Sequence, residues 1–329
     1  MSDPIQKIRL SETIGGKEVS IQTGTLAKQA GGAVTTHLGG TVILTTATVA
    51  ENAKLISFVP LTVEYRERTY AAGKIPGGFF KRETRPRDKE TLYARMTDRP
   101  IRPCFPKGWN HETMVYTLVI SSDCKNDAGP LSITGGSAAL LLSDAPFTEP
   151  VSGVRIGLLK DEFVLFPTME ERAELDMELV VAGKKGAILM VEGGAKEIPE
   201  EKLLKALELA QAEIDKLCEL QLRLVAEARK AGHAPVKYSV VAPEFPEPVR
   251  SFVTGKALEP IRKALHHGYK HKHGIAEQIK PLKESLVAEV LEKAKTDPAF
   301  AGQEVHVGAI LSEIKGEEGR AMIVHERVR

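Results

Sequence analysis

Residues 77–103 read GGFFKRETRPRDKETLYARMTDRPIRP, the most informative stretch of the chain. A double glycine precedes two aromatic residues, Phe79 and Phe80, which are followed by Lys81 and Arg82. Two adjacent rings on a mobile basic loop make a poor core element. In proteins that bind single strands, a ring stacks on any base for about 1–3 kcal/mol while cations hold the phosphates. The alternative is that both rings anchor the loop to the protein body, and the local pattern favours neither interpretation.

The second half of this stretch predicts a helix. Asp88 is a candidate N-cap, and Pro100 is expected to end the helix at residue 98 or 99. Arg95 and Arg99 then lie one turn apart on one side of the helix, and Arg102 follows the proline. Guanidinium groups suit planar, bidentate contact with phosphate. The alternative is pairing with carboxylates that are near in sequence, namely Glu83, Glu90 and Asp98.

On both sides of this stretch, the sequence predicts short strands that alternate with glycine turns. Residues 33–38 and 41–49 are β-rich runs around Gly39-Gly40, which predicts a hairpin whose second strand is buried and central. Further strands are predicted at residues 19–23, 61–65 and 113–120. An almost wholly apolar segment predicts a buried helix from about Gly135 to Ser143.

A second strand set follows Pro146 and leads into a long helix. The predicted strands span residues 154–159, 162–166, 176–182 and 186–192. Leucines at helical spacing predict a helix with Pro199 in its first turn and Gly232 at its end. Strands followed by packed helices indicate an α+β fold.

Three prolines within residues 242–248 predict a linker, and the apolar spacing beyond it is wholly helical. Helices are expected over residues 249–267, 275–295 and 305–315. The expected organisation is a β/α domain with halves at residues 1–146 and 147–235, an all-helical domain at 243–315, and a linker at 316–329.

Composition narrows the classes of protein. The chain has 329 residues, of which 42% are hydrophobic and 27% charged, so a disordered or fibrous protein is excluded. No apolar run approaches the ~20 residues that span a bilayer, and the N-terminus lacks a signal-peptide pattern. The three cysteines form no CxxC pair, which argues against disulfides and cysteine-rich zinc sites. We therefore expect a cytoplasmic protein with no membrane partner.

The charge is unevenly distributed. The whole chain carries only +1, but residues 66–107 hold twelve basic against five acidic side chains, a local charge of +7. Such asymmetry is expected where a polyanion binds. The alternative is a solvated charged face.

Several motifs resemble, in order and spacing, the first RNase PH-like domain of bacterial polynucleotide phosphorylases. The resemblance rests on Phe79–Arg82, Arg85-Pro86, Lys89–Leu92, Arg95 and Asp98–Pro103, supported by Thr23–Ala30, Ala138–Phe147, Val180–Gly183 and Leu189–Glu192. It implies an RNase PH-like (ribosomal protein S5 domain 2-like) fold, followed by that family's helical domain.

The resemblance implies a phosphate-dependent 3′→5′ exoribonuclease that releases nucleoside diphosphates from single-stranded RNA and runs in reverse as a polymerase. It implies inorganic phosphate as co-substrate, Mg²⁺ as cofactor, and a ring-shaped homotrimer with RNA threading a central pore. The pore loop corresponds to Phe79, Phe80, Lys81 and Arg82. The RNA path corresponds to Arg95, Arg99 and Arg102.

Two departures from the family pattern are Lys81 in place of arginine and Thr84 in place of glycine. More important, the family's phosphate-binding serines and catalytic aspartates, with the magnesium ligands, lie in a second RNase PH-like domain, expected after Arg329. Here the equivalent helix start, Thr134–Ala138, has one serine. Asp176 occupies the position of a catalytic aspartate and is interpreted as a relic or a strand-start residue, so no catalytic or metal-ligating residue is assigned.

Other interpretations remain open. A non-catalytic RNase PH-like subunit of an RNA-binding ring is the main alternative, while a hydrolytic metal-dependent nuclease lacks the carboxylate cluster it would need. The segment His266–His273 contains four histidines at metal-ligand spacing, but its two lysines oppose a dication and favour a basic surface. A degradosome-like partner is possible within the family and has no motif in this chain.

Overall fold

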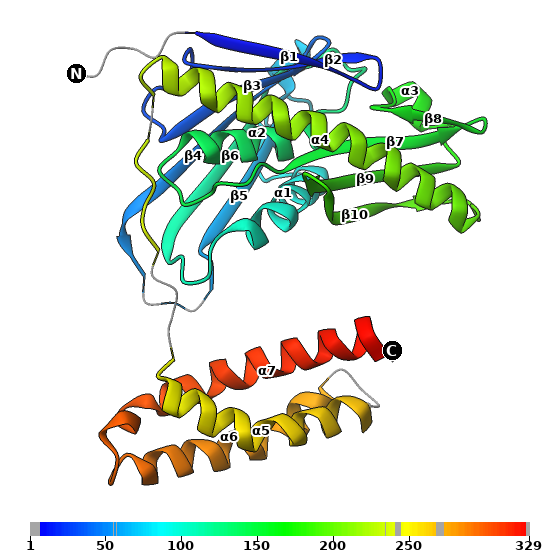
Figure 1. Ribbon diagram of the computed structural model, residues 1–329. Coiled ribbons are helices and arrows are strands. Elements are labelled where there is room, and N and C mark those ends of the chain that lie inside the picture. Colours follow the sequence, from blue (N-terminus) through cyan, green and yellow to red (C-terminus); the bar gives the residue numbers. More distant parts are fainter. Residues whose placement is uncertain are drawn as a thin grey trace. The chain divides into compact units, whose positions relative to one another are not determined.

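The computed structural model describes residues 7–54, 56, 58–233, 235–240, 245–267 and 273–326. The chain forms two compact units, Met1–Ala242 and Pro243–Arg329 (Figure 1). Within the described residues, none of the helices has the length and apolarity needed to cross a membrane.

The first unit begins with a six-stranded sheet in the order β1-β2-β3-β4-β6-β5, in which only the pairing of β5 with β6 is parallel. Its strands are β1 (Ile8–Ile14), β2 (Lys17–Thr23), β3 (Gly32–Leu38), β4 (Thr41–Ala53), β5 (Leu61–Glu67) and β6 (His111–Ser121). The predicted hairpin is confirmed, because Leu38 pairs with Thr41 across Gly39-Gly40 and Gly39 has a φ of 56°. The expected central position of β4 is also confirmed.

Helix α1 (Asp88–Ile101) differs from its prediction at both ends. Its N-cap is Arg87 and not Asp88, because the Glu90 carboxylate accepts a hydrogen bond from the Arg87 amide and closes the first turn there. The helix also continues through Pro100. The proline removes one intrahelical bond, but the Arg102 amide still donates to the Asp98 carbonyl, and the chain passes into the short helix η2 (Arg102–Cys104).

Helix α2 (Gly129–Leu142) is buried along its whole length. It begins six residues before the predicted start, since Pro130 suits the first turn and the Asp127 carboxylate accepts the Gly129 amide. Gly135 lies inside the helix where the helix meets β4: an added Cβ would come 2.7 Å from the Thr45 hydroxyl. The glycines that suggested a helix start are therefore packing positions.

A four-stranded antiparallel sheet, β10-β9-β7-β8, completes the first unit with α3 (Met169–Arg172) and the long helix α4 (Figure 1). Its strands are β7 (Ser152–Leu159), β8 (Glu162–Leu165), β9 (Met177–Lys184) and β10 (Ala187–Ala195). Helix α4 (Glu200–Lys230) is flanked by Pro199 and Gly232 as predicted, and it packs on β1, β7 and β9. One hydrophobic core therefore joins both sheets.

The second unit is all-helical, with α5 (Glu247–His267), α6 (Gly274–Lys293) and α7 (Val307–Ala321). Short helical turns η3 (Pro298–Phe300), η4 (Gln303–His306) and η5 (Met322–Glu326) connect or extend them. Two expectations need correction. Pro248 lies in the first turn of α5 and not in a linker, since a proline there loses no hydrogen bond. The last helix continues past residue 315, because Glu318 binds Arg262 of α5 and Glu326 lies 3.2 Å from His266.

Candidate nucleic-acid interface

The loop before α1 presents two aromatic rings to solvent. The side chains of Phe79 and Phe80 are 94% and 75% exposed, and their ring centroids lie 5.5 Å apart in an edge-to-face arrangement. Gly78 and Lys81 flank the rings with left-handed backbone, at φ values of 78° and 50°. The rings do not anchor the loop to the described part of the chain. Lys81 and Arg82 are also exposed, so rings and cations share one surface.

Glu83 fixes the base of this loop. Its Oε1 accepts hydrogen bonds from the Thr69 amide at 2.6 Å and the Thr69 hydroxyl at 2.7 Å, and its Oε2 lies 3.2 Å from the Arg68 guanidinium. These hydrogen bonds from Thr69, aided by Arg68, hold the pKa of Glu83 below its usual range. The loop is therefore held at its stem while its tip projects into solvent.

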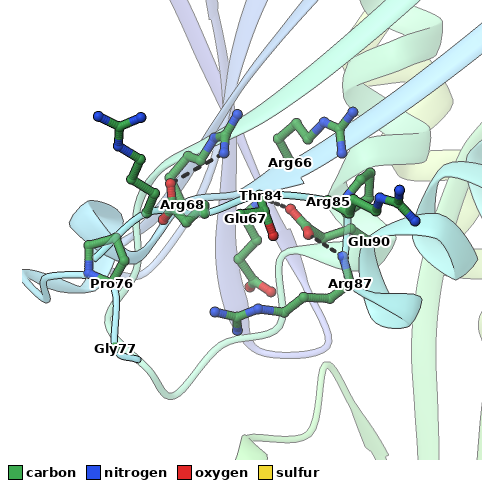
Figure 2. Close-up of a pocket in the computed structure, with 12 residues that line it drawn as sticks. Arg66, Glu67, Arg68, Pro76, Gly77, Thr84, Arg85, Arg87 and Glu90 are labelled. Atoms are coloured by element: carbon green, nitrogen blue, oxygen red, sulfur yellow. Dashed lines mark hydrogen bonds and ion pairs between the residues drawn. The ribbon is translucent and has the colours of Figure 1, made fainter. Parts of the chain in front are cut away.

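A cavity of about 280 Å³ opens beside this stem (Figure 2). Arginine, glutamate, proline, glycine and threonine make up its whole lining, with no aromatic side chain. The lining residues are Arg66, Glu67, Arg68, Pro76, Gly77, Arg82, Glu83, Thr84, Arg85, Pro86, Arg87 and Glu90. Five arginines and three glutamates thus contribute to the lining, at the end of β5, in the aromatic loop and at the start of α1.

The three carboxylates of this cavity are engaged elsewhere. Glu90 is buried and accepts the amides of Glu67 at 2.8 Å and Arg87 at 2.7 Å, tying β5 to α1. Glu67 pairs with Lys89 at 2.9 Å, and Glu83 binds Thr69 and Arg68 as described. Among the described residues, no carboxylate pairs with the side chains of Arg82, Arg85 or Arg87.

The three arginines expected along the RNA path have different environments. Arg95 is exposed on α1 and makes no ion pair within the described part of the chain. Arg99 lies 2.7 Å from Glu192 of β10. Arg102 contacts both carboxylate oxygens of Asp98 and donates to the carbonyls of Val59 and Leu61. Pairing with a nearby carboxylate therefore applies to Arg102, which clamps the end of α1 to β5.

A buried polar network lies next to α1 and was missed from the sequence. Asp127, only 4% exposed, accepts hydrogen bonds from Tyr93 at 2.9 Å and from Arg155 of β7 at 2.6 Å. Arg155 also pairs with Glu178 of β9, and Arg172 of α3 binds that same carboxylate at 2.6 Å. Although burial opposes ionisation, Arg155 and the hydrogen bonds hold the pKa of Asp127 below its usual range.

This network positions α1. Tyr93 belongs to that helix, so its hydroxyl ties the helix that carries Arg95 and Arg99 to the segment before α2 and, through Asp127 and Arg155, to β7. Gly129 and Pro130 follow Asp127 closely in the sequence, a pattern typical of a turn and not of a buried network. The only signal was an arginine, Arg155, in an otherwise apolar strand: such a residue needs a buried partner.

Asp176 and the helix-start serine have structural partners. Asp176 directly precedes β9, is 49% exposed, and lies 3.6 Å from the Lys196 ammonium. The Ser137 hydroxyl is buried and accepts the Val151 amide at 2.8 Å. Neither side chain lines the arginine-rich cavity.

The histidine segment is described only in part. His266 and His267 end α5, and His273 precedes α6, whereas His271 lies outside the described residues. Across the described part of the chain, no three His, Cys, Asp or Glu side chains gather as metal ligands.

The fold and the loop define an RNase PH-type domain. Residues 15–146 match domain 1 of the 3′ exoribonuclease family, and residues 149–213 match domain 2 of that family. The chain belongs to this family. A rice Rrp46 crystal structure shares the fold, with a TM-score of 0.51 and 14% identity over 68% of this chain and 97% of that chain.

More specifically, the chain is similar to polyribonucleotide nucleotidyltransferases. It is 41% identical to that of Gemmatimonas aurantiaca over 98% of this chain and 42% of the relative. It is also 41% identical to that of Elusimicrobium minutum over 99% of this chain and 45% of the relative. The chain spans less than half the length of these curated relatives. The RNase PH-like fold and the family expected from the sequence are both confirmed.

Proposed function

We propose that this chain is the N-terminal half of a phosphate-dependent 3′→5′ exoribonuclease, and that it supplies the path of single-stranded RNA. One observation carries the proposal: Phe79 and Phe80 are exposed beside Lys81 and Arg82, where rings can stack on bases and cations can hold phosphates. The family membership and the similarity to polyribonucleotide nucleotidyltransferases support the reaction class.

In this reaction an oxygen of inorganic phosphate attacks the phosphorus of the 3′-terminal phosphodiester. The bond from that phosphorus to the 3′ oxygen of the preceding nucleotide breaks, and a nucleoside diphosphate leaves. Mg²⁺ would neutralise charge on the transferred phosphoryl group. The described residues offer no carboxylate cluster that fits the ion, so no side chain of this chain is assigned to it.

The residues proposed to contact RNA are Phe79, Phe80, Lys81, Arg82, Arg95 and Arg99. Arg102 acts indirectly, because its guanidinium is committed to Asp98 and to two backbone carbonyls of the β5 segment. Asp176 is assigned no chemical step, since its printed partner is Lys196.

The assembly and cellular setting belong to the same proposal. A cytoplasmic homotrimer is proposed from the resemblance. The edge strand β10, where Ile188, Leu189 and Val191 are all at least 36% exposed, offers an apolar surface for contact with another copy. A degradosome-like partner remains an expectation of the resemblance, without a residue assigned to it.

The reaction is tested by phosphate-dependent release of ADP from poly(A), with and without Mg²⁺. We expect no release by this chain and release by the same chain extended through a second RNase PH-like domain. Release by the short chain would contradict the proposal, because it would place a working site among Asp176 and the arginines. Inactivity of both chains would favour the non-catalytic ring subunit.

The double substitution Phe79→Ala/Phe80→Ala should weaken binding of oligo(A) by about tenfold or more, because each lost ring forfeits about 1–3 kcal/mol of stacking. Fluorescence anisotropy with labelled oligo(A) measures the affinity. The melting temperature should be unchanged, since neither ring is packed in the chain. A lower melting temperature with unchanged affinity would show instead that the rings anchor the loop. Leu204→Ala, 60% exposed on α4, is a control for removal of an exposed apolar side chain.

A further inference from the structure

We propose that the arginine-lined cavity at the base of the aromatic loop binds one phosphate group, which in the proposed function is a phosphodiester of the RNA chain. The site consists of Arg66 and Arg68 at the end of β5 and of Arg82, Arg85 and Arg87 before α1 (Figure 2). The identification of this phosphate as part of an RNA chain rests on the proposed function. The anion-binding chemistry of the cavity does not depend on it.

The charges of the cavity are unbalanced in favour of an anion. Glu67, Glu83 and Glu90 are satisfied by Lys89, by Thr69 with Arg68, and by two backbone amides. In the described part of the chain, Arg82, Arg85 and Arg87 have no carboxylate partner. Arg66 pairs with Glu64 at 2.9 Å and Arg68 with Glu83 at 3.2 Å. The other three guanidinium groups keep planar forks that are suited to hold a phosphate.

The lining favours phosphate over base or sugar. It contains no aromatic ring on which a base could stack. The cavity volume of about 280 Å³ leaves room for a phosphate group. Phe79 and Phe80 project from the same loop and present apolar rings, whereas the cavity presents charged groups. We infer that the rings at the loop tip stack on bases and that the arginines at the loop stem bind a phosphate.

A bound phosphate would also link three segments. Gly77 precedes the rings and Arg82 follows them, while Arg66 lies on β5 and Arg87 caps α1. An anion that contacts these segments together fixes the stem of the aromatic loop against the domain. In the structure described, Glu83 connects the loop stem to Thr69 and Arg68, and Glu90 connects Arg87 to β5.

The test is the variant Arg85→Gln/Arg87→Gln, because neither guanidinium takes part in an ion pair among the described residues. The control Lys28→Gln/Arg229→Gln removes two exposed cations that are likewise unpaired there and lie outside the cavity. Oligo(A) affinity is measured from 50 to 300 mM salt. Competition by inorganic pyrophosphate separately tests binding of a free phosphate compound.

We expect the cavity variant to bind oligo(A) about tenfold more weakly at low salt. Its plot of log affinity against log salt should be shallower by about 0.7, the value for one phosphate on a single strand. The control should keep the wild-type slope, and Phe79→Ala/Phe80→Ala should lose affinity without a change of slope, since stacking releases no counterions.

An unchanged slope and affinity in the cavity variant, with loss in the phenylalanine variant, would overturn the cavity site while leaving the proposed function intact. If the wild-type chain binds no oligo(A), the proposed function fails, and pyrophosphate decides the cavity alone. Binding of pyrophosphate that depends on Arg85 and Arg87 would then support an anion site for free phosphate compounds. Binding that does not depend on them would overturn the site.

Discussion

Replacing Asp127 by alanine should lower the free energy of unfolding by about 3–5 kcal/mol, because it removes one partner of a buried charge network. Asp127 is 4% exposed and Arg155 is 7% exposed, so little solvent can replace the lost carboxylate. Arg155 and Arg172 would share the single carboxylate of Glu178, and the Tyr93 hydroxyl would lose its acceptor. Urea denaturation followed by circular dichroism measures the loss.

Asp176→Ala is the matched control. It also removes a carboxylate near a β-strand, but that carboxylate is half exposed and 3.6 Å from one lysine, an arrangement worth about 0–1 kcal/mol. If Asp127→Ala does not fold, Asp127→Asn retains an acceptor for Tyr93, and its free energy of unfolding should lie below that of Asp176→Ala but high enough for the chain to fold. Equal stability of Asp127→Ala and Asp176→Ala would show that the network contributes nothing to the fold.

Local patterns of the sequence predict those elements whose limits are set by local chemistry. Gly39-Gly40 joins two β-rich runs and sets a hairpin turn, because glycine takes the left-handed backbone that the turn requires. Pro199 and Gly232 bound α4 for equally local reasons. The motif around Phe79 likewise identified the family without any knowledge of packing.

Other features depend on partners that are distant in sequence. Asp127 and Arg155 are 28 residues apart, and no local pattern connects the two. Gly135 seemed to mark a helix start because glycine is a poor helix former, yet it is required where α2 meets Thr45. The hydrogen bonds from Arg102 to the carbonyls of Val59 and Leu61, and the cavity beside Arg87, likewise depend on where β5 lies relative to α1. Sequence reasoning therefore found the residues of the interface more readily than their division into RNA contacts and structural clamps.

The close approach of the β3 backbone to the α2 backbone predicts the second large loss of stability. Gly32→Ala should destabilise the chain by about 3 kcal/mol or more, the upper part of the range for overpacking a tight core. A Cβ at Gly32 of β3 would lie 1.9 Å from the carbonyl oxygen of Ala139 in α2. A flexible side chain could rotate away from such a contact, but a helix carbonyl cannot, so strand and helix must separate. Thermal denaturation measures the loss.

Gly194→Ala separates this steric effect from the general effect of adding a methyl group to a strand glycine. Gly194 lies in β10, and an added Cβ there meets no atom within 4 Å. The change should leave stability equal or raise it by about 0.4–1 kcal/mol, because alanine restricts the unfolded chain. A similar loss in both variants would mean that strand geometry, and not the contact with α2, is responsible. A loss confined to Gly32→Ala would show that the close approach of helix α2 to strand β3 requires this glycine.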